Sequence, residues 1–113
     1  MAQSEAAFQQ ECVMWFHNTY PELRGLLFMV NNNSTSKREG AFKKALGLVS
    51  GVSDLIFLYG CKAHCIELKT PTGYQSPEQI EWEQKVYEQG IDYYIINSLA
   101  KFKNLIMRII LEQ

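Results

Sequence analysis

The clearest structural signal in the chain comes from residues 51–69, which read GVSDLIFLYGCKAHCIELK. Two runs rich in β-forming residues, 55–59 and 63–68, flank a short break at residues 60–62 that contains a glycine. Runs of this kind around a short break are typical of a tight β-hairpin. We therefore expect two antiparallel strands joined by a short turn, and the remainder of the chain is interpreted outward from them.

The register of this hairpin predicts which side chains meet at its open end. A turn centred between Gly60 and Cys61 sets Asp54 opposite Glu67, because both residues lie the same number of positions from that centre. Lys69 lies on the same face as Glu67, since strand side chains alternate with a period of two. The open end is thus predicted to present aspartate, glutamate and lysine side chains together.

The composition is that of a single globular domain spanning residues 1–113. Hydrophobic residues make up 47% and charged residues 20%, which argues against disorder over most of the chain. No run of about 18 apolar residues is present, and the N-terminus lacks the basic and then apolar pattern of a secretory signal. We expect a cytoplasmic protein without a membrane segment. The formal net charge of −1 means that any nucleic acid must be held by a local basic patch.

Three cysteines, Cys12, Cys61 and Cys65, form no disulfide framework and are expected to be free thiols in a reducing compartment. Cys61, His64 and Cys65 are partial zinc ligands by type. A closed structural zinc site needs four ligands, and no second pair has a suitable spacing. A zinc site is therefore disfavoured.

Outside the hairpin, the patterns predict a helix at 4–18, a strand at 26–30 buried on both faces, a capped helix at 76–89, a strand at 92–97 and a last helix from residue 99. The strand, helix and strand succession from Ile66 to Ile96 predicts that the last strand pairs in parallel with the second hairpin strand through a right-handed crossover. The order is α-β-β-β-α-β-α. It indicates an α/β fold with a mixed four-stranded sheet flanked by helices.

Two helices can bring further polar groups to the hairpin. Glu5 and Glu11 lie at the edge of the apolar face of the first helix, and each is also explained as a solvated acid. Ser76 and Gln79 form a capping box at the start of a later helix. Capping alone explains Gln79, so a role for it at a site needs further evidence.

A basic segment follows the first strand and an asparagine-rich stretch. One interpretation is a solvated loop and short helix, and the other is an arm that contacts the phosphate backbone of nucleic acid. The candidate DNA-contacting residues are Asn32, Asn33, Lys37, Arg38, Lys43 and Lys44.

The hairpin end suits phosphodiester hydrolysis. Two carboxylates a few ångströms apart repel each other unless they share a cation or a proton, and Mg²⁺ prefers such hard oxygen ligands. A lysine beside the metal can orient the attacking water and offset charge in the transition state. The alternative is a purely structural role, in which Asp54 begins a strand while Glu67 and Lys69 form an ion pair on an exposed edge.

At these positions the chain resembles the VRR-NUC family of the PD-(D/E)XK nucleases. The segments that carry the resemblance are Glu5-Ala6-Ala7-Phe8-Gln9, Gly51-Val52-Ser53-Asp54, Ile66-Glu67-Leu68-Lys69, Ser76-Pro77-Glu78-Gln79-Ile80-Glu81-Trp82, and Gly90 with the strand after it. Together they cover nearly the whole chain. The family usually has proline where this chain has Ser53, a departure in the turn rather than at a ligand.

The resemblance implies a restriction-endonuclease-like core and assigns roles to individual residues. Asp54 and Glu67 would bind Mg²⁺, or Mn²⁺ in its place, with the Leu68 carbonyl as a further ligand. Lys69 would assist the water. Glu5 would complete the acidic cluster and Gln79 would line the site.

The resemblance also implies a function. Short stand-alone members of the family look like viral or bacterial nucleases that dimerise and act on branched DNA. The chain is therefore expected to be a metal-dependent endodeoxyribonuclease that cuts four-way (Holliday) junctions or other branched DNA as a homodimer, in the cytoplasm of a bacterium or a phage-infected cell. Two alternatives remain open: a non-catalytic DNA-binding or protein-interaction module with the same fold, and a sequence-specific restriction-like nuclease.

Overall fold

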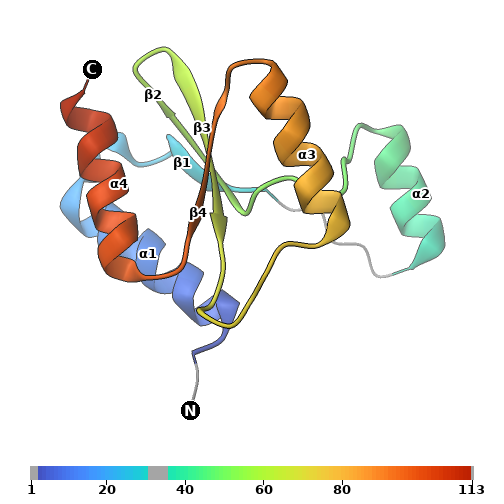
Figure 1. The fold of residues 1–113 in the computed structure, drawn as a ribbon, viewed down its shortest axis with the longest axis horizontal. Coiled ribbons are helices and arrows are strands. Elements are labelled where there is room, and N and C mark those ends of the chain that lie inside the picture. The colour runs from blue at the N-terminus through green and yellow to red at the C-terminus, as the bar shows by residue number, and fades with distance from the viewer. Residues whose placement is uncertain (1–2, 31–35, 113) are drawn as a thin grey trace.

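A computed structural model describes residues 3–30 and 36–112 (Figure 1). Its helices and strands are, in chain order, α1 (Glu5–Thr19), the 3₁₀ helix η1 (Pro21–Leu23), β1 (Leu27–Met29), α2 (Lys37–Ala45), β2 (Leu55–Tyr59), β3 (Lys62–Leu68), α3 (Pro77–Glu88), β4 (Asp92–Ile96) and α4 (Leu99–Leu111). The predicted α-β-β-β-α-β-α succession is present. The helix α2 is an addition to it, between β1 and β2.

The four strands form one sheet in the order β1-β2-β3-β4. β2 is antiparallel to both β1 and β3, and β4 is parallel to β3, as predicted. Tyr59 pairs with Lys62 in the hairpin, which confirms a turn centred between Gly60 and Cys61. Both turn residues have positive φ, 63° and 64°. This is the requirement of a type I′ turn, whose twist matches that of the two strands.

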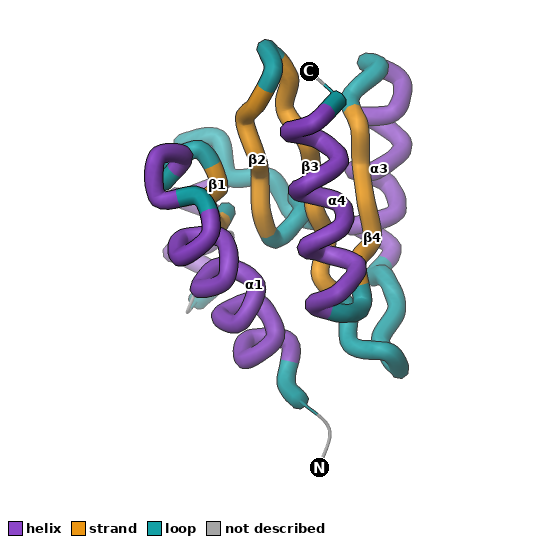
Figure 2. Tube along the Cα trace, turned by 90° about the vertical axis from the view of Figure 1, so that its left-hand side faces the viewer, coloured by secondary structure: helices purple, strands orange, loops and turns teal. Residues whose placement is uncertain are grey.

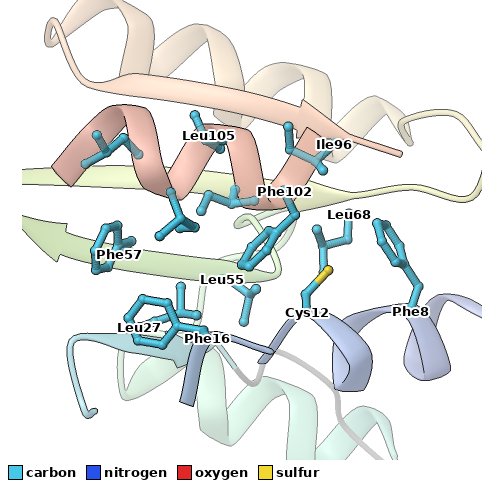
Figure 3. Packing of buried hydrophobic residues seen from close by; sticks show 13 residues of the cluster. Phe8, Cys12, Phe16, Leu27, Leu55, Phe57, Leu68, Ile96, Phe102 and Leu105 are labelled. Carbon is cyan, nitrogen blue, oxygen red and sulfur yellow. The ribbon is translucent and has the colours of Figure 1, made fainter. Parts of the chain in front are cut away.

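The helices cover the two faces of the sheet unequally. In Figure 2, α1 and α4 lie together on one face and α3 lies on the other. The main core fills the space beneath α1 and α4 (Figure 3). Its buried residues come from both helices and all four strands: Phe8, Cys12, Phe16, Leu27, Leu55, Phe57, Ile66, Leu68, Ile96, Phe102, Leu105, Ile106 and Ile109. A much smaller cluster, Cys65, Val86 and Tyr93, lies beneath α3.

Local sequence signals explain where the two core helices begin. The Ser4 hydroxyl accepts a hydrogen bond from the Ala7 amide, and the Ser98 hydroxyl accepts one from the Lys101 amide. Each serine thus satisfies an amide that the helix itself leaves unpaired. From these starts, the apolar residues at helical spacing face the sheet.

The prediction that strand 26–30 is buried on both faces is wrong. The regular strand β1 has three residues and lies at one edge of the sheet. Leu27 is buried, whereas Phe28 and Met29 are 41% and 61% exposed. A continuous apolar run therefore did not distinguish an interior strand from an edge strand with exposed apolar side chains.

None of the helices in residues 3–30 and 36–112 has the length and apolar character needed to cross a membrane.

Candidate metal centre

Asp54 is held in place at the open end of the β2–β3 hairpin by two backbone contacts. Its Oδ2 accepts a 2.7 Å hydrogen bond from the Leu68 amide, and its carbonyl oxygen accepts a 3.0 Å hydrogen bond from the Val30 amide. The first contact ties the carboxylate to the end of β3. Asp54 therefore lies where the hairpin register predicted it, across from Glu67.

The loop before Asp54 is packed against the start of α3. Gly51 has a φ of +84°, and a Cβ atom at this position would overlap the Glu78 carbonyl oxygen. Only glycine allows both the backbone conformation and this close approach. Ser53 is fully buried, and its hydroxyl donates a 3.1 Å hydrogen bond to the Leu55 carbonyl oxygen. This contact fixes the turn where the resembling family usually has proline.

Glu67 is a charged side chain in a fully buried position. Its Oε2 accepts a 2.5 Å hydrogen bond from Gln79 Nε2 and lies 3.3 Å from Lys69 Nζ. Its other oxygen, Oε1, is also buried and has no hydrogen-bond partner among the residues that the structure describes. A buried acceptor without a partner is costly. A cation bound beside Glu67 would give this oxygen a partner.

Gln79 performs two tasks with one side chain. Its Oε1 accepts a 2.8 Å hydrogen bond from the Ser76 amide, which closes the capping box of α3. Its Nε2 donates to Glu67. Capping orients the amide, and the oriented amide then holds Glu67. The structure thus brings Gln79 into contact with Glu67, while a role for Gln79 at the site stays a prediction.

Glu5 joins Asp54 and Glu67 from the first turn of α1. One carboxylate oxygen from each of the three residues lies within 4.8 Å of the other two. Glu11 accepts a 2.6 Å hydrogen bond from Gln3 and is not a member of this cluster. Of the two helix acids left open by the sequence, Glu5 is the one that the fold brings to the hairpin end.

The electrostatics of the cluster disfavour ionisation. Burial, followed by the charge of Asp54, raises the pKa of Glu67 to about 7, although Lys69 opposes the shift. Burial also raises the pKa of Asp54, against the hydrogen bond from Leu68. Glu5 acts in the same direction as burial on both. Three carboxylates thus face one lysine, and a bound cation would balance them.

The donor set fits a divalent metal with a preference for oxygen ligands. Asp54 and Glu67 offer carboxylate oxygens, including the unpartnered Glu67 Oε1. The Leu68 N–H points to Asp54, and its carbonyl lies on the same side of the strand because both groups of a strand residue share one edge. Mg²⁺ and Mn²⁺ suit carboxylate and carbonyl oxygens. Asp54, Glu67 and the Leu68 carbonyl are therefore the residues that can hold the ion.

The alternative zinc ligands do not assemble into a site. Cys61 is exposed in the hairpin turn, whereas Cys65 is buried beneath α3. Across residues 3–30 and 36–112, the one group of potential metal ligands within reach of each other is Glu5, Asp54 and Glu67.

The basic residues predicted to contact DNA form a separate region. Lys37, Arg38, Lys43 and Lys44 lie on α2, which has no buried residue and stands on the α3 side of the molecule, opposite α1 and α4 (Figure 1). Lys43 lies 2.7 Å from Glu39, one turn earlier in the helix. Asn32 and Asn33 lie outside the described residues.

Tyr93 and Gln75 are neighbours of the site that sequence reasoning did not identify. Gln75 Nε2 donates hydrogen bonds to the Tyr93 hydroxyl and to Glu83, and burial together with the Glu67 charge raises the pKa of Tyr93. Tyr93 pairs with Cys65 in the parallel register, which places it on the Glu67 face of the sheet. Strand alternation combined with that register would have found it.

Comparison with known proteins identifies the fold. A solved structure described as a "VRR_NUC domain protein" is similar to this chain with a TM-score of 0.80 at 20% sequence identity, over 97% of this chain and 90% of that one. Neither a family model nor a curated protein sequence matches the chain. The shared fold confirms the architecture that the sequence predicted, a mixed four-stranded sheet flanked by helices.

Proposed function

We propose that this protein is a divalent-metal-dependent endonuclease that hydrolyses DNA phosphodiester bonds. The observation that carries the proposal is the fully buried Glu67, whose unpartnered oxygen belongs to a carboxylate cluster with Asp54 and Glu5. The fold neighbour carries the VRR_NUC name, and the family of that name, which the sequence resembles, consists of nucleases. The first line of support concerns the hairpin end, and the second concerns the fold as a whole.

The proposed roles follow from the contacts of each residue. Asp54, Glu67 and the Leu68 carbonyl would hold Mg²⁺ or Mn²⁺, which when bound would supply a Lewis acid for the phosphate and lower the pKa of bound water. Lys69, 8% exposed and 3.3 Å from Glu67 by its Nζ, orients the water whose oxygen attacks phosphorus as the P–O ester bond breaks. Gln79 keeps Glu67 in position, and Glu5 supplies an outer carboxylate.

The proposal includes a route for the DNA backbone. A groove of about 320 Å³ at the start of α3 is lined by Ser50, Gly51, Ser76, Glu78 and Gln79, and Gln79 connects it to the site through its hydrogen bond to Glu67. The basic helix α2 stands on this side of the molecule (Figure 1). Its lysines and arginine would contact phosphates, so DNA binding should weaken as the salt concentration rises.

We further infer that the substrate is branched DNA and that the protein acts as a homodimer. The resemblance suggests both, and the edge of the sheet supports the second. Phe28 and Met29 of β1 are exposed beside a groove of about 550 Å³ that continues onto α1 at Ala6 and Val13. A second copy can cover this apolar surface, and two copies would supply the two cuts that a four-way junction needs. Light scattering of wild-type protein and Met29→Glu tests this, and a monomeric wild type contradicts it.

The central experiment compares wild-type protein with Asp54→Asn on labelled four-way junction, flap, single-stranded and duplex DNA. Each substrate is incubated with Mg²⁺, with Mn²⁺ or without a divalent metal. We expect metal-dependent nicking of the branched substrates by wild type and no product from Asp54→Asn. The matched control is Asp92→Asn, because Asp92 is the other aspartate of the chain and starts β4 at the far end of the paired strands.

The same experiment separates the proposal from its alternatives. Full cleavage by Asp54→Asn would refute the catalytic assignment. Tight binding of junctions without any product over a range of metal concentrations would favour a non-catalytic DNA-binding module. Equal cleavage of linear duplex with a fixed sequence pattern would favour a restriction-like nuclease.

A further inference from the structure

A second hollow lies close to the metal centre, and we name it the side cleft. It has a volume of about 420 Å³, within the range of pockets that hold small molecules. The apolar part of its lining comes from Phe8, Pro71 and Leu99, and Phe8 is only 3% exposed. Gln3, Glu11 and Asn97 add polar groups. The described residues assigned to the metal centre do not line this cleft.

The side cleft and the metal centre share the same chain segments. Thr70, in the cleft wall, directly follows Lys69, and consecutive Cα atoms are only about 3.8 Å apart. Gln3 and Phe8 lie on either side of Glu5 in the sequence. Figure 1 shows the start of α1, the loop after β3 and the turn into α4 meeting at the lower end of the molecule. A DNA strand bound at the metal centre would therefore have this cleft within reach.

The chemistry of the lining selects the part of a nucleotide that can enter. The described lining contains no lysine or arginine, and it contains the carboxylate of Glu11, which repels phosphate. A flat, uncharged base instead matches apolar walls with amide and hydroxyl groups at the rim. Gln3 Nε2 holds the Glu11 carboxylate with a 2.6 Å hydrogen bond. Carboxylates accept hydrogen bonds from the exocyclic amino groups of cytosine and adenine, which thymine lacks.

We propose that the side cleft receives one unpaired nucleobase next to the phosphate that is cut. The inference rests on the proposed nuclease function and adds a substrate requirement to it. A fully paired duplex keeps its bases stacked, whereas a branch point offers a base that leaves the stack at little cost. The cleft thus selects unpaired positions, and Glu11 favours a base with an amino group over thymine.

The test uses junction DNA with 2-aminopurine placed, one position at a time, within two nucleotides of the cut mapped with wild-type protein. Fluorescence is recorded on binding in Ca²⁺. We expect a severalfold rise at one position, because unstacking removes quenching of this base. Thr72→Trp, which fills the cleft from its exposed loop, should abolish the rise and weaken junction binding about tenfold to a hundredfold. Thr19→Trp, at an exposed position outside the cleft lining, is the matched control.

Glu11→Gln adds a test of base preference. The wild type should bind junctions with cytosine at the responsive position more tightly than those with thymine, and the variant should lose this difference while its melting temperature stays unchanged. Normal metal-dependent cleavage without a fluorescence rise at any position overturns the side-cleft proposal alone. An unchanged rise in Thr72→Trp overturns it as well. Absence of cleavage by the wild type in Mg²⁺ and Mn²⁺ overturns the proposed function, and the side-cleft proposal falls with it.

Discussion

The two faces of the sheet are built on opposite principles. Beneath α1 and α4, thirteen buried residues form a continuous core without a charged side chain (Figure 3). Beneath α3, the buried hydrophobic cluster has three members, and Glu67 and Lys69 are buried at the neighbouring strand end. The first face can account for the stability of the fold. The second face carries the ionisable side chains that can take part in a reaction.

This difference has an energetic meaning. Burying a large apolar side chain contributes about 1.5–3 kcal/mol, and the face under α1 and α4 does this many times. Burying a carboxylate with one oxygen unpartnered is unfavourable unless a proton or a cation neutralises it. The unfavourable free energy of burying Glu67 on the α3 face is thus offset by the apolar burial on the other face. Substitutions on the two faces should therefore move stability and activity in different ways.

The sharpest contrast is expected from Glu67→Gln. This change keeps the shape of the side chain and an oxygen that can accept from Gln79, but it removes the charge proposed to bind the metal. Under the proposed function, cleavage should fall about 10³-fold or more, because a proposed ligand of the metal is lost. At pH 8 the free energy of unfolding should rise, because a buried charge is removed. Single-turnover cleavage and urea unfolding measure the two effects.

Glu22→Gln provides the control for Glu67→Gln, since Glu22 is an exposed glutamate in η1. Neither its activity nor its stability should differ from wild type. A Glu67→Gln protein that is inactive because it is unfolded would contradict the comparison of the two faces.

The opposite result is expected from Phe102→Ala. Phe102 of α4 is fully buried in the main core. Its ring packs edge-on against that of Trp15, with the two ring centroids 6.0 Å apart. Truncation of a buried phenylalanine costs about 3–5 kcal/mol. The unfolding midpoint should drop accordingly, while the cleavage rate of the fraction that remains folded stays near that of wild type. A large loss of rate at full folding would show that the two faces are coupled.

The pH dependence of stability should report the α3 face. The pKa of Glu67 is raised from 4.5 to about 7, so the folded state keeps a proton that the unfolded state releases between these values. The free energy of unfolding should therefore fall as the pH rises from 4.5 to 7, by about 3 kcal/mol. The raised pKa of Asp54 acts in the same direction.

Urea unfolding without divalent metal at pH 5 and pH 8 measures this slope. Glu67→Gln should lose most of it, and Mg²⁺ should restore stability to the wild type at pH 8. If the free energy of unfolding depends on pH equally in the variant and the wild type, a group other than Glu67 causes the dependence.

The contrast between the faces also explains which features the sequence could predict. Residue counting around Gly60 and Cys61 located Asp54 and Glu67, because register follows from turn position alone. The helix cap at Ser76 could be predicted, because a capping box is a local sequence pattern. The positions of the two core helices, α1 and α4, followed from the helical spacing of their apolar residues.

Features that depend on contacts between elements far apart in the chain could not be predicted from the sequence. The exposure of Phe28 and Met29 follows from the edge position of β1, which no local pattern records. Only tertiary packing decides that Glu5 rather than Glu11 reaches Asp54. The contact between Gln79 and Glu67 likewise depends on Gly51, whose missing side chain lets its loop approach α3.

The smallest expected effect concerns Gln79, which connects helix capping to the metal centre. Gln79→Ala removes the hydrogen bond to Glu67 Oε2 and should weaken divalent metal binding about tenfold to a hundredfold, the usual consequence of losing a residue that orients a ligand. Ser76→Ala removes the other half of the capping box but leaves the Gln79 side chain. It should cost about 1 kcal/mol of stability with little change in metal affinity. Calorimetric titration with Mn²⁺, together with urea unfolding, separates the two effects. Equal losses of affinity in both variants would mean that the position of α3, rather than the Gln79 amide, controls Glu67.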